Sequence, residues 1–157
     1  MSGLDSLYQD LILDHSKHPH GQGLSPEEGR SASSHQHNPM CGDDITLRVR
    51  VDDAGERIVD LSWEGSGCSI SQASASMLVS LVEEDSPTRA DASALIEHFR
   101  EALRSRGTIP LDEETYADAA ALSGVSKFSA RVKCAMLAWV AAEDAMLQAR
   151  GGVPAQS

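Results

Sequence analysis

The sequence contains no long apolar run and few basic residues, and each absence excludes classes of protein. No stretch reaches the length of a membrane span and no secretory signal is recognisable, so we expect a cytoplasmic protein that does not act at a membrane. Lys and Arg total 13 against 24 Asp and Glu, which gives a net charge of −11. This charge argues against nucleic acid and anionic membranes as partners, whereas a basic patch on another protein would be attracted.

Cysteine is also scarce, with only three in the chain. No two of these cysteines form a Cys-x-x-Cys pair. In a reducing compartment, an odd number of thiols is more typical of free, catalytic or metal-bound cysteines than of disulfides. The 157 residues, 41% of them apolar, suit a single domain with one hydrophobic core. We therefore assign residues 1–157 to one domain, with a loop over about 16–40 and a frayed tail over 151–157.

Hydrophobic periodicity predicts an α+β fold, in which helices pack on one face of a small antiparallel sheet. The alternation of apolar and polar residues over 45–51 and 59–63, around the turn at 52–55, predicts a β-hairpin. Helical spacing of apolar residues predicts five helices, which we place over 4–15, from about 71, from about 95 to Gly107, over 113–122 and over about 129–150. We expect Trp63 and Trp139 in the core.

Each cysteine lies next to the start of a predicted element. Cys41, in "NPMCGDD", is on the loop that enters the hairpin, and Asp43 follows it at a spacing that places both side chains on one side of an extended segment. Cys68 follows a glycine and precedes a helix, whose N-terminal dipole favours a thiolate. Cys134 lies near the start of the last helix. If these elements pack together, the thiols can converge.

Three thiolates and a carboxylate are a sufficient donor set for a tetrahedral zinc ion. However, the intervals of 27 and 66 residues between the cysteines match no zinc-finger template. Free cysteines are also among the most frequently buried residues. Spacing alone therefore leaves two alternatives open, a metal site or three unrelated buried thiols beside a surface acid.

Four segments carry a resemblance to a known family. "NPMCGDD", "GSGCSISQASASML" and "RVKCAMLAW" resemble the three cysteine motifs of the U-type iron–sulfur cluster assembly proteins, and "LYQDLILDHSKHPHGQG" resembles their first helix and following loop. The resemblance extends over about residues 4–147. Scaffolds of the IscU kind carry histidine before the third cysteine, where this chain has Lys133. That lysine, together with a helix-sized insert over roughly 85–107, is similar to the SufU branch.

The resemblance implies a zinc-dependent sulfur acceptor, a sulfurtransferase-like role beside a desulfurase. Zn²⁺ would be bound by Cys41, Asp43, Cys68 and Cys134, and Cys41 would receive the sulfur. Arg131 and Lys133 would be neighbours of the site. The implied partners are a pyridoxal-phosphate-dependent cysteine desulfurase of the SufS type and downstream iron–sulfur assembly proteins.

Two other functions stay open at this point. The same thiols could assemble a [2Fe–2S] cluster as a scaffold, although Lys133 in place of histidine counts against this. A zinc hydrolase or deaminase would need an open metal position and a general base, but four protein ligands leave no open position and the chain has no His-x-Glu motif. For His35 and His37 we expect a solvated loop and no metal, and for His15 a helix cap or a partner contact.

Overall fold

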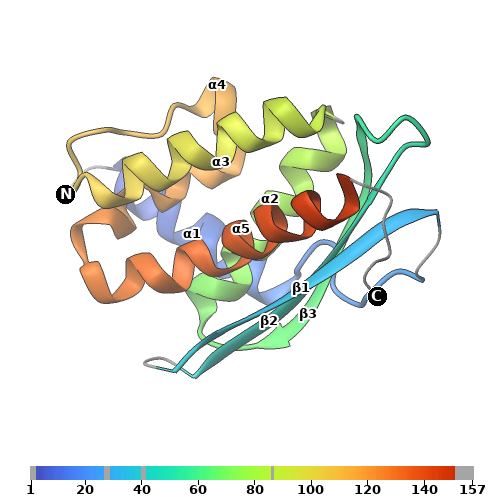
Figure 1. Ribbon diagram of the computed structural model, residues 1–157. Helices are drawn as coiled ribbons and strands as arrows, with labels where there is room; N and C mark the ends of the chain where they lie inside the picture. The colour runs from blue at the N-terminus through green and yellow to red at the C-terminus, as the bar shows by residue number, and fades with distance from the viewer. Residues whose placement is uncertain (1–2, 27–28, 40–41, 86, 151–157) are drawn as a thin grey trace.

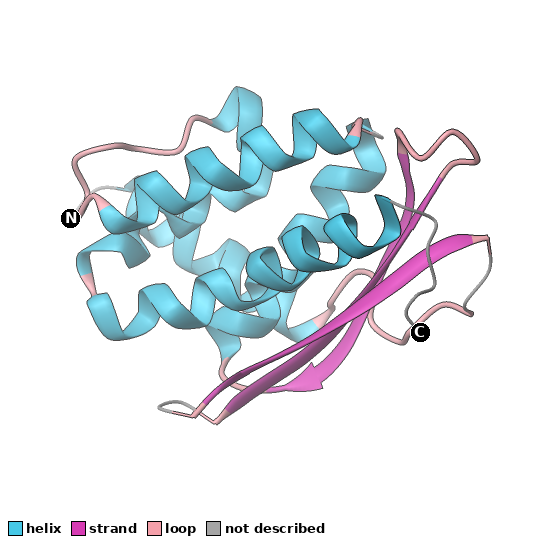
Figure 2. Ribbon diagram, viewed as in Figure 1, coloured by secondary structure: helices cyan, strands magenta, loops and turns pink. Residues whose placement is uncertain are grey.

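The computed structural model describes residues 3–26, 29–39, 42–85 and 87–150. In these ranges the elements follow in the order α1 (Gly3–Lys17), β1 (Arg30–Asn38), β2 (Asp43–Val51), β3 (Ile58–Ser66), α2 (Ser69–Asp85), α3 (Arg89–Arg104), α4 (Glu113–Tyr116), the 3₁₀ helix η1 (Ala117–Lys127) and α5 (Ser129–Arg150). Figures 1 and 2 show the helices gathered on one face of a twisted sheet. The predicted α+β class is confirmed. The predicted tail, 151–157, lies outside the described residues.

The sheet has three antiparallel strands in the order β1–β2–β3, so β2 is central. Along β2 the odd-numbered residues are buried and the even-numbered residues are half-buried, which matches the predicted alternation. The inward side chains Ile45, Leu47 and Val49 are fully buried under the helices. The predicted hairpin of β2 and β3 is confirmed, and its inner face forms one side of the hydrophobic core.

Strand β1 corrects the prediction of a continuous loop over about 16–40. Its sequence, "RSASSHQHN", has no apolar alternation, yet it pairs with β2 from Arg30↔Val51 to Asn38↔Asp43. A helix also holds the strand in place, because the Ser34 hydroxyl donates to Asp144 Oδ2 of α5 at 2.7 Å. Tertiary pairing overrides weak intrinsic propensity here. His35 and His37 consequently lie on a strand and not on a loop.

Helix α5 is the central helix, and the prediction of its range, 129–150, is confirmed. Its Trp139 is fully buried and stacks on Phe99 of α3, with ring centroids 3.7 Å apart. The Trp139 Nε1–H donates to Ser74 Oγ of α2 at 2.8 Å. Trp63 of β3 is also fully buried, so both tryptophans lie in the core as predicted.

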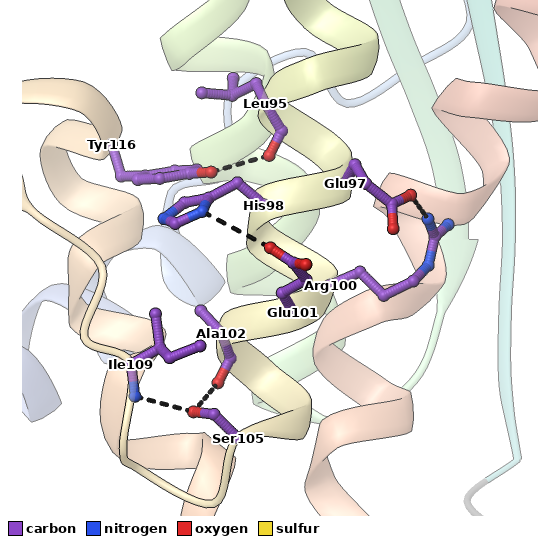
Figure 3. A network of polar contacts seen from close by, with 9 residues as sticks. All are labelled: Leu95, Glu97, His98, Arg100, Glu101, Ala102, Ser105, Ile109 and Tyr116. Atoms are coloured by element: carbon purple, nitrogen blue, oxygen red, sulfur yellow. Dashed lines mark hydrogen bonds and ion pairs between the residues drawn. The ribbon is translucent and has the colours of Figure 1, made fainter.

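Helix α3 occupies the insert between the second and third cysteine motifs. Figure 3 shows its polar contacts, including the Tyr116 hydroxyl that donates to the Leu95 carbonyl at 2.7 Å. The helix ends at Arg104, before the predicted Gly107, because Ser105 caps it and donates back to the Ala102 carbonyl at 2.6 Å. The short helix predicted over 113–122 is divided into two helices in the structure. It is a four-residue α4 that stops at Ala117, where φ is +50°, followed by η1.

His15 corrects a second prediction, since it neither caps α1 nor faces solvent. It is 4% exposed. Its Nδ1 lies 2.7 Å from Ser76 Oγ of α2, and its Nε2 lies 2.9 Å from Asp118 Oδ2 of η1. The imidazole therefore joins α1 to two other elements inside the fold. Among the described residues, no helix combines the length and apolar character that crossing a bilayer requires.

Candidate metal centre

Three of the four predicted ligands come together in space. Ligand atoms of Asp43, Cys68 and Cys134 all lie within 4.8 Å of one another. Asp43 is the first residue of β2, Cys68 immediately precedes α2, and Cys134 lies in the second turn of α5. The sheet and two helices thus meet at the point where these residues lie, although their positions in the sequence are far apart.

Asp43 is the most enclosed member of the group. It is fully buried on the inner face of β2. Its Oδ1 accepts a hydrogen bond from the Cys68 backbone N–H at 2.8 Å, and its Oδ2 lies 3.9 Å from Cys68 Sγ. The carboxylate therefore caps the N-terminus of α2, where the helix dipole favours negative charge. This bond fixes the position of Cys68 relative to the sheet.

Gly67 makes the close approach of Asp43 to α2 sterically feasible. A Cβ at this position would lie 2.4 Å from Asp43 Oδ1 and 2.6 Å from Ser71 Oγ. Real Cβ atoms do not tolerate such contacts, so only glycine fits without displacing the carboxylate. Ser71 is itself buried, and its hydroxyl donates to the Cys68 carbonyl at 3.2 Å. From the sequence, Ser71 was predicted to lie at the start of the helix and was not assigned to the site. The signal for Gly67 was its place directly before the cysteine.

The two thiols differ in exposure. Cys134 is 2% exposed, whereas Cys68 is open to solvent. Both line a cavity of about 970 Å³, whose wall also carries Arg131, Phe128 and Ile109. The Arg131 guanidinium lies over the Phe128 ring, 5.5 Å from its centroid. The site is therefore closed on the side of the core and open on the side of this cavity.

Lys133 has a different position from Arg131. It is exposed and lines a separate hollow of about 590 Å³, together with Asn38, the last residue of β1, and Pro39, which follows it. The two residues that were expected as neighbours of the site thus lie on different walls, with Arg131 on the side of Cys68 and Cys134.

Cys41, the fourth predicted ligand, lies outside the described residues, so its role stays a prediction. The structure describes the residues on either side of this gap, up to Pro39 and from Gly42. Asn38 and Asp43 form the last pair of the β1–β2 ladder, and the Gly42 N–H donates to the Asn38 carbonyl at 2.9 Å. Gly42 has φ of +73°, which favours glycine. Gly42 alone separates Cys41 from the buried carboxylate of Asp43.

The donor set suits a zinc ion. Two cysteine sulfurs and a carboxylate oxygen are ligands that Zn²⁺ takes in proteins, at about 2.3 Å and about 2.0–2.2 Å respectively. Asp43 is buried without a cationic side chain among its hydrogen-bond donors in the described ranges. A bound cation would balance that charge, and the sulfurs lie near enough to share it.

Comparisons with known proteins place the chain in a family. The model of the NifU-like N-terminal domain matches residues 7–135. The zinc-dependent sulfurtransferase SufU of Bacillus subtilis (strain 168) is 38% identical over 152 residues, which cover 96% of this chain and 97% of that protein. The iron–sulfur cluster assembly scaffold protein IscU of Streptococcus pyogenes serotype M1 is 38% identical over 146 residues, covering 93% and 86%.

Solved structures have the same architecture. A protein from Fervidobacterium islandicum AW-1, designated as an iron–sulfur cluster assembly scaffold for the SUF system, matches with a TM-score of 0.68 and 29% identity, covering 90% of this chain and 97% of that one. The match with the B. subtilis protein extends over nearly the whole of both chains. The chain therefore belongs to the NifU-like N-terminal domain family, which includes the SufU and IscU proteins of iron–sulfur cluster assembly.

Proposed function

We propose that this protein is a zinc-dependent sulfur acceptor of iron–sulfur cluster assembly. It takes persulfide sulfur from a pyridoxal-phosphate-dependent cysteine desulfurase of the SufS type, in the cytoplasm, and passes it to downstream assembly proteins. The observation that carries the proposal is the convergence of Asp43, Cys68 and Cys134, and Cys41 lies two residues before Asp43 in the sequence. The B. subtilis relative, named as a zinc-dependent sulfurtransferase, supports the same function.

Cys41, Asp43, Cys68 and Cys134 would hold the zinc. When bound, the metal keeps its cysteine ligands deprotonated near neutral pH. Asp43 and Cys134 are buried, and Cys68 is fixed by its backbone bond to Asp43. Cys41 lies between Asn38 and Asp43, within the four residues that connect two paired strands. We therefore assign Cys41 as the thiol that reacts with the persulfide, while Asp43, Cys68 and Cys134 would continue to hold the zinc.

The transfer is a thiol–disulfide exchange. The Cys41 thiolate attacks the outer sulfur of the persulfide that the desulfurase carries on its own cysteine. A new S–S bond forms at Cys41, the S–S bond on the partner breaks, and its electron pair leaves with the partner's cysteine as a thiolate. The step needs no external oxidant or reductant. Arg131, on the wall of the open cavity, contributes positive charge near the path of the anionic persulfide.

A scaffold function is the second candidate, because the S. pyogenes relative is named a scaffold and the same thiols suit an iron–sulfur cluster. The two functions predict different metals. Protein produced without added iron should contain about one zinc per chain if it is a sulfur acceptor. After reconstitution with iron and sulfide, a scaffold would develop visible absorbance, whereas a zinc-filled acceptor would stay colourless.

Three alanine variants test the proposed roles of the cysteines. Cys68→Ala and Cys134→Ala should lose most of the zinc and unfold at lower temperature, because metal binding contributes to the free energy of folding. Cys41→Ala should stay folded and keep weaker zinc on three protein ligands and water. It should nevertheless accept no radiolabelled sulfur from the desulfurase. If Cys41→Ala still accepts sulfur while a folded Cys68→Ala or Cys134→Ala does not, the acceptor is a different thiol.

A further inference from the structure

The hollow that Lys133 lines is a basic surface on an acidic protein. It lies where the end of β1, the C-terminal end of α3 and the N-terminal half of α5 meet, and its volume is about 590 Å³. Its walls carry Arg100, Arg104, Arg106 and Lys133, four of the chain's 13 basic residues. The described residues that line it include no Asp or Glu, although the chain has a net charge of −11. A negative ligand is therefore attracted here and repelled over most of the remaining surface.

Three of these four cations are not neutralised by neighbouring side chains. Arg100 is the exception, because it pairs with one carboxylate of α3 and one of α5, at 2.6 and 2.7 Å, and Figure 3 shows the pair on α3. In the part of the chain that the structure describes, Arg104, Arg106 and Lys133 form no ion pair, and all three are exposed. Their charge is available to a ligand.

The backbone at Arg106 is a second, independent observation. Arg106 has φ of +58°, in the left-handed region that favours glycine, directly after Ser105, which caps α3. A glycine would adopt this conformation without steric cost, and Gly107 is the next residue. The chain thus keeps a guanidinium at the rim of the hollow at a cost to its own backbone. Strain of this kind is typical of residues that are used for binding.

The floor of the hollow is apolar. Leu103 of α3 and Met136 and Leu137 of α5 are buried beneath it, and Val132 and Val140 of α5 are half-buried. We propose that this surface, the basic hollow, docks an acidic segment of another protein in which carboxylates flank apolar side chains. The carboxylates pair with the three cations, while an apolar side chain covers the floor.

The exposure of the cations favours such a segment over a single small anion. One exposed ion pair strengthens binding by only roughly twofold to fivefold. A stable complex therefore needs several carboxylates held at once, which a peptide segment supplies on one chain. Contact with the apolar floor adds to the affinity, and an inorganic anion has no apolar part that could make this contact.

The basic hollow is separate from the cavity of the thiols, since no described residue lines both. It nevertheless adjoins the connection that carries Cys41, because Pro39, one of its lining residues, precedes Cys41 by two positions. The docking of an acidic segment does not rest on the proposed sulfur transfer, and the two are tested separately.

Binding of a fluorescent, blocked peptide of glutamate and leucine to the full-length protein tests the proposal. Fluorescence anisotropy at low ionic strength should show binding that weakens as salt is added, and no binding of the same peptide with glutamine in place of glutamate. Arg104→Gln, Arg106→Gln and Lys133→Gln should each lower the affinity by roughly twofold to fivefold, and the triple variant by about tenfold or more. Lys17→Gln is the matched control and should bind like the parent protein, since Lys17 is exposed on α1 and does not line the hollow.

The variant Arg106→Gly separates binding from folding. It should be no less stable to urea than the parent protein, because glycine adopts the left-handed conformation freely, yet it should bind the peptide as weakly as Arg106→Gln. If Arg106 only caps the helix, Arg106→Gly will bind the peptide as tightly as the parent protein, and the assignment of its side chain to docking is overturned.

Three further results would overturn the proposal. The first is that the acidic peptide does not bind, or that the triple variant binds it as tightly as Lys17→Gln. The second is that inorganic phosphate at an equal concentration of charge displaces the peptide completely, because the site would then take small anions. The third is that sedimentation shows self-association of the parent protein and none of the triple variant, because the occupant would then be a second copy of this chain.

Discussion

Replacing Gly67 by alanine tests whether the glycine before Cys68 is required by contact with Asp43. The new methyl group would lie 2.4 Å from Asp43 Oδ1 and 2.6 Å from Ser71 Oγ, so at least one of these atoms must move. The Asp43 carboxylate accepts the hydrogen bond from the Cys68 backbone N–H, with an N···Oδ1 distance of 2.8 Å. The substitution therefore acts on the geometry of the site without removing any ligand.

The loss of stability in Gly67→Ala can be estimated from the two ways in which the protein could relieve the contact between the new methyl group and Asp43. If the structure keeps the hydrogen bond, it bears the cost of overpacking, about 1–3 kcal/mol. If the carboxylate moves away, the fold loses a hydrogen bond to a charged group, which contributes about 1.5–3 kcal/mol. Because relieving one cost incurs the other, they do not add, and we expect about 2–3 kcal/mol of destabilisation. For a chain of this size, that corresponds to a melting temperature lower by roughly 4–12 °C.

Chemical denaturation and zinc analysis of Gly67→Ala measure these effects. Gly124→Ala is the matched control, since a Cβ there meets nothing within 4 Å, and it should unfold within about 0.5 kcal/mol of the parent protein. We expect Gly67→Ala to hold less zinc per chain than this control. If Gly67→Ala is as stable as Gly124→Ala and holds as much metal, the contact with Asp43 does not determine the geometry of the site.

Two further predictions concern the helices that cover the sheet. Phe99→Ala should lower the free energy of unfolding by about 3–5 kcal/mol, because the Phe99 ring is fully buried and stacks on Trp139. Urea denaturation of the variant and the parent protein measures this difference. Burial, with a smaller effect of the Asp112 charge, raises the pKa of Tyr116 above its ordinary 10.0. The unfolded chain then loses this proton first, so stability should fall as the pH rises above 10.0, and less steeply in Tyr116→Phe.

How well each strand could be predicted depended on how many apolar side chains it buries. The central strand β2 has apolar residues at every second position, and its sequence predicts it without ambiguity. The edge strand β1 is almost entirely polar, and it exists because β2 pairs with it and α5 packs against it. Neither partner is visible in the local sequence. Residues 30–38 therefore resembled a loop, and His35 and His37 were misplaced with it.

The convergence of three candidate ligands could be predicted from the sequence, whereas their packing could not. A cysteine next to the start of each element indicated convergence, and the structure brings Cys68 and Cys134 to Asp43. The burial of Asp43 could not be predicted, because an aspartate at a strand start is usually exposed. The burial depends on the N-terminus of α2 and on the absence of a side chain at Gly67. Both features lie 24 or more residues away from Asp43 in the sequence.

The register of β2 determines which chemistry each face of the sheet carries. Asp43 and Asp44 are identical side chains, but the period of two along a strand turns the first inward, where it is fully buried, and the second outward, where it is 45% exposed. A shift of one residue would place Asp44 next to Cys68 and would turn the apolar residues Ile45, Leu47 and Val49 toward solvent. Because these apolar residues are fully buried in the core, that shift would be severely destabilising. The hydrophobic pattern of one strand thus fixes the carboxylate of the thiol site and, one residue later, the carboxylate that contacts His35 and His37 of β1.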